Sequence, residues 1–221
     1  MTAAYHVKSV MDYDKLIFFF YNYNQRAYEG EKTAVQYFAS VLKGDFIECD
    51  VRWLDSVSTS MINSDKKPED MSSKSIKNTE KESANWYVPC RNLIFISNAL
   101  AYAESEFIKS GIQSDIITGF KNDGAETFPD TTKEFADALT NISHISTAAK
   151  SKILSPLIEM DKEDIVKLGL KYSIPAEKTF SCYVGPEKHC GICLACRLRK
   201  EGFYWANITD KTAYLKDKAR L

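Results

Sequence analysis

The run Lys15-LIFFFY-Asn22 decides the fold class of this chain. Six consecutive apolar residues between two polar ones are typical of a β-strand that is buried on both faces of a parallel sheet. A sheet of that kind needs helices on both of its faces to exclude water. The segments around residues 15–22 are therefore expected to include helices with one apolar face.

The flanking sequence alternates between helix and strand patterns. Residues 31–44 carry apolar side chains at helical spacing and end at Gly44, a residue type favoured at helix C-termini. Asp130 and Asp161 stand where an aspartate can cap the first backbone N–H groups of a helix. The patterns predict helices over residues 2–11, 31–44, 91–111, 130–143 and 161–175, and further strands over 45–51 and 114–120. This alternation predicts an α/β fold with a mostly parallel sheet and helices on both faces.

The composition excludes several classes of protein. Of the 221 residues, 44% are hydrophobic and 27% are charged, as in an ordinary globular protein, and the formal net charge is −1. That charge supplies no basic field for direct contact with nucleic acid. The longest apolar run, residues 16–21, is too short to span a bilayer, and the N-terminus lacks the apolar core of a signal peptide. We expect a cytoplasmic protein that does not contact a membrane.

One segment interrupts the alternation. Residues 56–85 are rich in Ser, Lys, Asp, Glu and Asn and have almost no apolar residue after Ile62. A loop of this length in a compact domain is usually a functional lid or an insertion without a role. Both alternatives predict that the loop is mobile.

Four of the six cysteines lie within residues 182–196 with the spacing C-x7-C-x2-C-x2-C. Zinc takes four thiolates in a tetrahedron, and each C-x2-C step places two thiolates on one side of an ion. Free thiols, disulfides and redox chemistry are the alternatives, although a reducing compartment disfavours disulfides. We predict a structural zinc site whose ligands are Cys182, Cys190, Cys193 and Cys196.

The neighbouring histidine, the two remaining cysteines and the basic residues that follow the cluster are expected to play no part in metal binding. His189 is adjacent to Cys190, but four cysteines already complete a tetrahedron. Cys49 and Cys90 are expected to be small buried residues. The basic residues that follow the cluster are diluted by acidic ones, so they are expected to form a solvated helix face: Arg197, Arg199 and Lys200.

Five segments in this order carry a family resemblance. They are Asn22-YNQ-Arg26, Trp86-YVPCR-Asn92, Thr118-GFKNDGAETFP-Asp130, Ser155-PLIEMDKEDI-Val166 and the four-cysteine tail followed by Arg197-Leu198-Arg199. Over about residues 2–205 the chain resembles the 7-cyano-7-deazaguanine (preQ0) synthase family, which is ExsB-like. The tail is the most specific part of the resemblance.

The resemblance implies a fold, a reaction and partners. The fold is the Rossmann-like adenine-nucleotide α-hydrolase fold, with a nucleotide-binding domain over residues 1–170 and a small helical zinc-binding region over residues 171–221. The reaction is the ATP-dependent conversion of 7-carboxy-7-deazaguanine and ammonia to preQ0, which feeds queuosine or archaeosine in tRNA. The implied cofactors are Zn²⁺ and ATP with Mg²⁺. A small deazapurine substrate, ammonia and a second copy of the chain in a homodimer are the implied partners.

The resemblance also implies roles for individual residues. Helix N-termini and basic side chains neutralise phosphate charge, and Arg91 and Lys162 each begin a predicted helix. Without the resemblance, Arg26 and Arg91 would be assigned to surface ion pairs and Lys162 to a solvated first turn. The resemblance implies that Lys162, Arg91 and Asp130 are catalytic and that Gln25, Arg26, Asn92 and Gly119 bind the nucleotide.

The sequence departs from the family at its most diagnostic element. The first strand and the Ser-Gly-Gly-x-Asp-Ser loop, which cradles phosphate with backbone N–H groups, do not occur in the 221 residues. Because loss of a middle strand would leave buried backbone groups unpaired, we expect Met1 to be an internal residue of a longer protein. As written, the chain is expected to bind ATP weakly.

Other departures concern the substrate. Asn24 replaces a glycine, Ala27 a histidine and Cys90 a small residue that is usually glycine. Residues 124–132 also differ: Gly124 replaces Asp, Thr127 replaces Gly, and Thr131-Thr132 replace Cys-Arg, whereas Phe128-Pro129-Asp130 is retained. Two alternatives therefore stay open, a non-catalytic zinc-containing scaffold of the same fold and a pyrophosphatase-loop enzyme that acts on another carboxylate or base.

Overall fold

The computed structural model of the chain describes residues 1–11, 13–68, 83–121 and 128–216. The chain divides into two compact units, one formed by Met1–Pro89 with Asp161–Leu221 and one formed by Cys90–Met160. Within these described ranges, each unit contains helices and one pair of parallel strands, which confirms the predicted α/β class. The boundary at residue 170 stays a prediction. In the part of the chain that is described, no helix combines the length and apolarity that crossing a bilayer requires.

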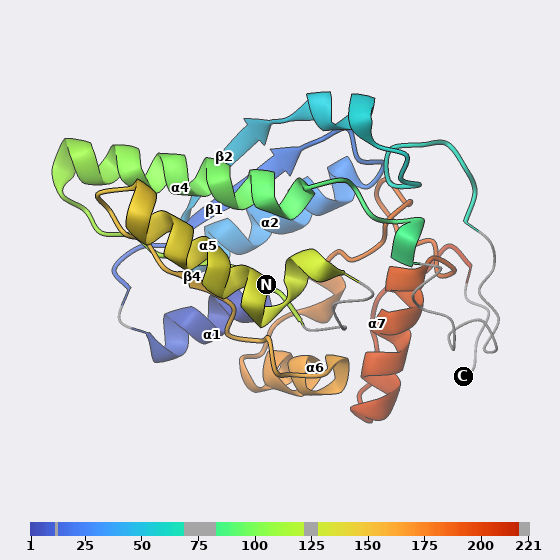
Figure 1. Cartoon of the computed structure of the whole chain (residues 1–221). Coiled ribbons are helices and arrows are strands. Elements are labelled where there is room, and N and C mark those ends of the chain that lie inside the picture. Colours follow the sequence, from blue (N-terminus) through green and yellow to red (C-terminus); the bar gives the residue numbers. More distant parts are fainter. Residues whose placement is uncertain (12, 69–82, 122–127, 217–221) are drawn as a thin grey trace. The chain divides into compact units, whose positions relative to one another are not determined.

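The first unit is built around two parallel strands. β1 (Ile17–Asn22) pairs with β2 (Asp45–Asp50), so that Ile17 lies opposite Asp45 and Asn22 lies opposite Asp50. α2 (Tyr28–Leu42) connects them and packs against both (Figure 1). Strand, helix and parallel strand therefore form one βαβ unit, as the apolar run predicts. The short helix η1 (Arg52–Val57) follows β2.

Apolar side chains join these elements. Phe18, Ala39 and Leu42 form a buried cluster between β1 and α2. Partly buried residues of α1 (Thr2–Val10), among them Tyr5, pack against it. The predicted C-cap at Gly44 is wrong by one residue, because Lys43 adopts the left-handed conformation that ends α2. Gly44 instead passes so close to Leu16 that a Cβ would lie 2.7 Å from its carbonyl oxygen.

The first unit ends with helices that pack on one another. α6 (Lys162–Lys171) lies against α7 (Leu194–Trp205), as Figure 1 shows, and α1 also contacts α6. The short helix η4 (Ala176–Lys178) lies between them in the sequence. α7 begins directly after Cys193, so the predicted helical region at the C-terminus carries the cysteine cluster at the start of a helix.

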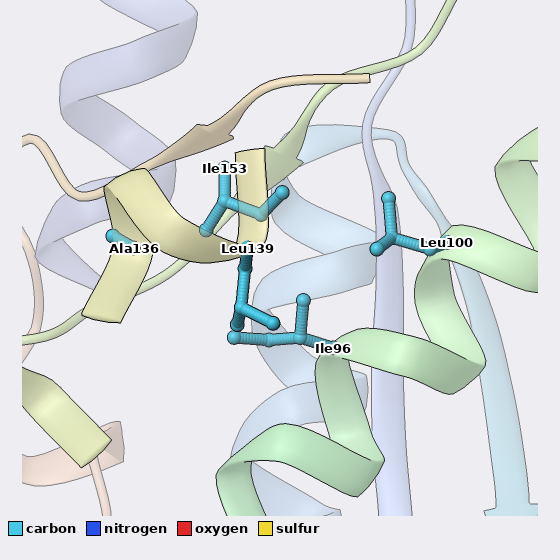
Figure 2. Close-up of a cluster of buried hydrophobic side chains, with 5 residues drawn as sticks. All are labelled: Ile96, Leu100, Ala136, Leu139 and Ile153. Carbon is cyan, nitrogen blue, oxygen red and sulfur yellow. The ribbon is translucent and has the colours of Figure 1, made fainter. Parts of the chain in front are cut away.

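The second unit has its own core. α4 (Arg91–Ser110), β3 (Ile116–Ile117), η3 (Pro129–Thr131), α5 (Lys133–Ser146) and β4 (Ile153–Leu154) follow in order. Parallel β3 and β4 pair from Ile116 opposite Ile153 to Ile117 opposite Leu154. Figure 2 shows the apolar side chains that α4, α5 and β4 direct toward one another: Ile96, Leu100, Ala136, Leu139 and Ile153.

Two predicted boundaries in this unit are wrong. The strand predicted over residues 114–120 is confined to Ile116–Ile117, because pairing with β4 extends over only two residues. α5 begins at Lys133 rather than Asp130, since the hydroxyl of Thr132 accepts the capping hydrogen bond from the backbone N–H of Phe135 at 3.2 Å. Asp130 lies in η3 instead.

The polar segment is described only at its ends. The backbone N–H of Met61 donates to the carbonyl of Asn85 at 2.8 Å, and the hydroxyl of Ser60 donates to the same carbonyl at 3.3 Å. The two ends therefore lie side by side. The predicted mobility of the loop concerns mainly residues 69–82, which lie outside the described residues.

Candidate functional site

The four clustered cysteines converge in the first unit. Their Sγ atoms all lie within 4.8 Å of one another, and Cys182–Cys193 and Cys190–Cys196 are each separated by 3.9 Å. A disulfide requires about 2.0 Å between sulfurs, so these are free thiols. All four side chains are buried. Four buried thiols at this separation have the donor set and spacing of a tetrahedral metal site.

The backbone around the cluster is arranged to stabilise thiolates. The N–H groups of Gly185 and Cys190 point at the sulfur of Cys182 at 3.1 and 3.3 Å, and that of Cys193 points at the sulfur of Cys190 at 3.3 Å. A Cβ at Gly185 would lie 1.9 Å from the carbonyl oxygen of Lys188, so only glycine permits this turn. N–H donors of this kind hold negative charge on sulfur and suit metal coordination.

Without an ion the thiols share their protons unequally. Hydrogen bonds from the neighbouring thiols, that of Cys182 first, lower the pKa of Cys190. The same interactions raise the pKa of Cys196, whose proton is held by the other sulfurs. Four adjacent thiolates cannot coexist without a cation. Metal binding must therefore displace protons from the cluster.

His189 is adjacent to Cys190 but does not join the cluster. Among the described residues, the group that could hold a metal consists of the four cysteines alone. The buried imidazole accepts a hydrogen bond through Nε2 from the backbone N–H of Ser181 at 3.2 Å. Burial, followed by the charge of Arg199, lowers the pKa of His189 to about 4, so the ring is neutral at pH 7. The neutral ring is thus hydrogen bonded to the backbone of the loop at Ser181.

Gln25 and Arg26 lie in the turn after β1 and bind protein groups. The Gln25 side chain is buried, its Oε1 accepts from the N–H of Tyr23 at 2.9 Å, and its Nε2 donates to Tyr21 O at 2.9 Å and Glu31 Oε2 at 3.1 Å. Arg26 donates through Nη1 to the carbonyls of residues 64 and 66 at 3.0 and 2.7 Å. Both side chains therefore shape the carboxyl end of β1 and the start of the polar segment.

Arg91, Asn92 and Asp130 come together at the N-terminus of α4. Nδ2 of Asn92 donates to the backbone carbonyl of Asp130 at 3.2 Å, and Nε of Arg91 lies 3.4 Å from Oδ1 of Asn92. Burial raises the pKa of Asp130, against the charge of Arg91 and a hydrogen bond from the backbone N–H of Asn92. A buried carboxylate thus lies at the positive end of a helix.

Gly119 follows β3 at the carboxyl edge of the small sheet. Space is open around it, since a Cβ at Gly119 would have no neighbour within 4 Å. Nearby, the hydroxyls of Thr118 and Ser155, which follow β3 and β4, are hydrogen bonded at 2.7 Å. In parallel α/β sheets this edge is where ligands bind. Gly119 is therefore accessible at the carboxyl edge of the small sheet, the edge at which α/β proteins bind ligands.

Lys162 is the first residue of α6 and is exposed. Asp161 occupies the predicted N-cap position, but its side chain makes no capping hydrogen bond. A Cβ at Gly202 of α7 would lie 3.0 Å from Cβ of Lys162, so the two helices meet at this point. The N-terminus of α6 is thereby fixed to the helix that begins at the cysteine cluster.

Three expectations about other residues are wrong. Arg199 does not lie on a solvated face, because its side chain is only 10% exposed and forms an ion pair with Asp210 at 3.1 Å. Cys90 is exposed and Cys49 is partly buried, so neither is a core residue. Arg199 follows Cys196 by three positions, but no local pattern around Asp210 predicts that this isolated aspartate pairs with Arg199.

Two positions where the resemblance expects glycine have backbone conformations that glycine favours. Asn24 has a φ of 60° and Cys90 a φ of 54°, both in the left-handed region. Asn24 lies in the turn after β1, and Cys90 immediately precedes α4. The backbone at these two sites thus has a shape that suits glycine, although both residues carry a side chain.

Comparison with known proteins places the chain in a family. The family described as "Queuosine biosynthesis protein QueC" matches residues 2–207. A 7-cyano-7-deazaguanine synthase of Methanosphaera stadtmanae is 36% identical over 208 residues, which are 93% of this chain and 89% of that protein. Proteins of the same name from Methanobrevibacter smithii and Nitratiruptor sp. are each 34% identical, over 88% and 96% of this chain and 85% and 92% of their own lengths. The chain therefore belongs to the QueC family of queuosine biosynthesis proteins and has its adenine-nucleotide α-hydrolase-like fold.

Proposed function

We propose that this protein is a 7-cyano-7-deazaguanine synthase, which converts 7-carboxy-7-deazaguanine and ammonia to the nitrile with ATP. The observation that carries the proposal is the family match over residues 2–207, which includes both the cysteine cluster and the segments at the carboxyl ends of the strands. The product is an intermediate of queuosine or archaeosine synthesis. The reaction class is carbon–nitrogen ligation driven by ATP.

The chemistry requires two activations of one carbon. A carboxylate oxygen first attacks ATP and becomes a good leaving group, and ammonia then displaces it to give an amide and a proton. The amide oxygen is activated in the same way by a second ATP and departs bonded to the group that it received from ATP, while the nitrogen loses its two remaining protons, which leaves the nitrile. Each step therefore needs positive charge at the phosphates and a group that accepts a proton.

Lys162 is proposed to supply positive charge. It stands at the N-terminus of α6, where the helix dipole already favours an anion, and the Asp161 side chain does not cap the helix there. A lysine in a first turn is mildly unfavourable for the fold, by a few tenths of a kcal/mol. Its position is explained if it faces phosphate in the complex.

Asp130 is proposed to accept the proton of ammonia or of the amide. Burial raises the pKa of its carboxyl group, which moves it toward that of a useful general base. Arg91 is proposed to neutralise phosphate charge, while Asn92 holds Asp130 through the 3.2 Å hydrogen bond to its backbone. Gly119 is proposed to let the nucleotide approach the carboxyl edge of β3, and Gln25 and Arg26 are proposed to shape the turn after β1.

The cysteine cluster is proposed to hold one structural Zn²⁺ through Cys182, Cys190, Cys193 and Cys196. Four soft thiolates fill all four positions of a tetrahedral zinc ion and leave none for water, which suits a structural role. The expected Zn–S distance is about 2.3 Å. When bound, the ion cross-links the loop that precedes α7. It takes no part in the chemical steps, whereas Mg²⁺ arrives with ATP.

The test is nitrile formation by the purified protein. The zinc-loaded chain is incubated with 7-carboxy-7-deazaguanine, ammonium and MgATP, and the nitrile is measured by mass spectrometry. Nitrile that depends on all three components supports the proposal. Folded, zinc-loaded protein that consumes ATP only with another carboxylate supports a related ligase instead.

A second candidate is a non-catalytic zinc-containing scaffold of the same fold. The cysteine cluster and the family match are common to both candidates. Calorimetry separates the two candidates. A scaffold binds zinc but not 7-carboxy-7-deazaguanine, whereas the synthase binds both.

A further inference from the structure

The segment Ile208–Lys216, here called the tail strap, lies directly on the cysteine loop. The backbone N–H of Leu215 donates to the carbonyl of His189 at 2.8 Å, and that of Lys216 donates to the carbonyl of Cys190 at 3.2 Å. His189 and Tyr214 form a parallel bridge, and their rings meet edge to face at 5.6 Å. The strap therefore adds a strand-like layer over the loop that carries Cys190.

The contact between strap and loop is close. Gly191 has a φ of 82°, and a Cβ there would lie 2.1 Å from the carbonyl oxygen of Lys216. Only glycine permits both the turn and the approach of the strap. Cys190, which directly precedes Gly191, is 9% exposed, and the other three cysteines of the cluster are fully buried. The strap is thus part of what separates the cluster from water.

One side chain of α7 fastens the strap. The guanidinium of Arg199 donates through Nε to Asp210 at 3.1 Å and through Nη2 to the hydroxyl of Thr212 at 2.8 Å, both in the strap. It also donates to the hydroxyl of Thr179 at 2.7 Å and to the carbonyl of Ala176 at 2.9 Å. Arg199 therefore ties together α7, the segment that leads into the cysteine loop, and the strap.

Asp210 completes the connection from the strap side. Its carboxylate accepts hydrogen bonds from the hydroxyl of Tyr214 at 2.5 Å and from the backbone N–H of Thr212 at 3.0 Å. The side chains of Arg199 and Asp210 are only 10% and 9% exposed, so solvent screens this pair weakly. Removing either partner leaves a buried charge without compensation and favours release of the strap.

From these contacts we infer that Arg199 and Asp210 form a latch that retains the metal ion in the cysteine cluster. The inference rests on the proposed zinc site. A buried ion can leave only after the loop opens, and the loop cannot open while Leu215 and Lys216 are hydrogen bonded to it. Strap release is therefore a required step in metal loss. Arg199 and Asp210 are positioning residues and touch neither the metal nor the substrate.

The experiment measures the rate at which zinc passes from the full-length protein to an excess of a colorimetric chelator. Arg199→Met and Asp210→Asn are expected to release zinc at least tenfold faster than the unmodified protein, while each still binds one zinc when the metal is in excess. The double variant is expected to be no faster than the faster single variant, because one latch is broken in each case. Tyr214→Phe removes only one hydrogen bond to Asp210. Its rate of zinc release is expected to lie between the rate of the unmodified protein and the rates of the Arg199 and Asp210 variants.

The matched control is Arg197→Met, which removes the same charge from the same helix two residues away. Its zinc release is expected to stay within twofold of the unmodified rate. Hydrogen exchange supplies a second readout, in which the amides of Leu215 and Lys216 exchange faster in the latch variants and not in the control. A general loss of folding would instead accelerate exchange throughout α7.

Three outcomes decide whether Arg199 and Asp210 form a latch. Faster release and faster strap exchange in the latch variants support the inference. Equal release rates in zinc-loaded protein of all variants overturn the latch and leave the zinc site intact. Purified protein that binds no zinc in any form refutes the metal centre, and the latch with it.

Discussion

Gly202 of α7 lies so close to Lys162 of α6 that a Cβ on Gly202 would be 3.0 Å from Cβ of Lys162 and 3.3 Å from its carbonyl oxygen. The first turn of α6 is therefore seated directly on α7. Because α7 begins at the cysteine cluster, the packing connects the proposed metal site to the position of Lys162. This connection is a rigid one, since two of the three contact atoms at Gly202 belong to the backbone of Lys162.

Gly202→Ala is expected to displace the first turn of α6 by a few tenths of an ångström and to lower turnover. Gly169→Ala, in α6 itself, is the matched control, because a Cβ there would meet only ordinary contacts at 3.7 and 4.0 Å. Gly169→Ala is expected to stabilise the protein by about 0.5–1 kcal/mol through helix propensity. Thermal melting and turnover of both variants check this. If Gly202→Ala has the same melting temperature and the same activity as Gly169→Ala, the two helices can accommodate a Cβ at Gly202 without a functional displacement of α6.

Lys162→Ala is expected to lower ATP-dependent nitrile formation by at least about tenfold, a loss of about 1.4 kcal/mol of transition-state stabilisation. The fold and the zinc content are expected to stay unchanged because Lys162 is exposed. Lys167→Ala is the control, since it removes an equally charged side chain of the same helix that pairs with Glu163 at 3.1 Å on the surface. Unchanged turnover in Lys162→Ala would show that Lys162 is a solvated surface residue with no role in catalysis.

Cys193→Ser is expected to abolish binding of one zinc per chain and to destabilise α7, because metal binding here contributes directly to folding. Since the thiol protons must leave when the ion enters, zinc affinity is expected to rise with pH, with proton release measurable by calorimetry in buffers of different ionisation enthalpy. Cys49→Ser, outside the cluster, is expected to leave zinc content at one per chain. Metal analysis that finds substoichiometric zinc in the unmodified protein would contradict the prediction.

Asp130→Asn is expected to keep or raise stability at neutral pH while it lowers turnover. Burial raises the pKa of Asp130 in the folded protein above the unfolded value of about 3.9, so the ionised form is destabilising. The stability of the unmodified protein relative to Asp130→Asn should therefore be greatest below about pH 4 and fall as pH rises through the folded pKa. Denaturant unfolding across this pH range measures the difference.

The control for this substitution is Asp137→Asn, which removes an exposed carboxylate from α5. It is expected to leave turnover unchanged. A loss of stability in Asp130→Asn that grows toward neutral pH would show that the carboxylate serves mainly to stabilise the N-terminus of α4.

Cys90→Gly is expected to stabilise the protein by about 0.5–1 kcal/mol, because the left-handed conformation at a φ of 54° costs a residue with a side chain more than it costs glycine. Cys90→Ala is the matched control, since it removes the thiol and keeps the unfavourable backbone. It is expected to leave stability within about 0.5 kcal/mol of the unmodified value. If both variants are stabilised equally, loss of the thiol and not relief of the backbone conformation accounts for the gain in stability.

The sequence by itself predicted the α/β class and the cysteine cluster. Both depend on local patterns: the apolar run at residues 15–22 defines a buried strand, and the C-x7-C-x2-C-x2-C spacing brings thiols together through short turns. Local patterns do not determine the exact ends of the helices. Asp130 and Thr132 are both good capping residues two positions apart, and only the packing of η3 at the N-terminus of α4 determines which of them caps α5.

Only the tertiary structure decided what the polar side chains do. Gln25 could have faced a ligand, but its amide binds Tyr21, Tyr23 and Glu31. Arg199 has the sequence context of a solvated helix face, yet it is buried against Asp210. The physical reason is that apolar periodicity and ligand spacing act over a few residues, whereas a buried hydrogen bond or ion pair depends on which distant segment the folded chain places beside the side chain.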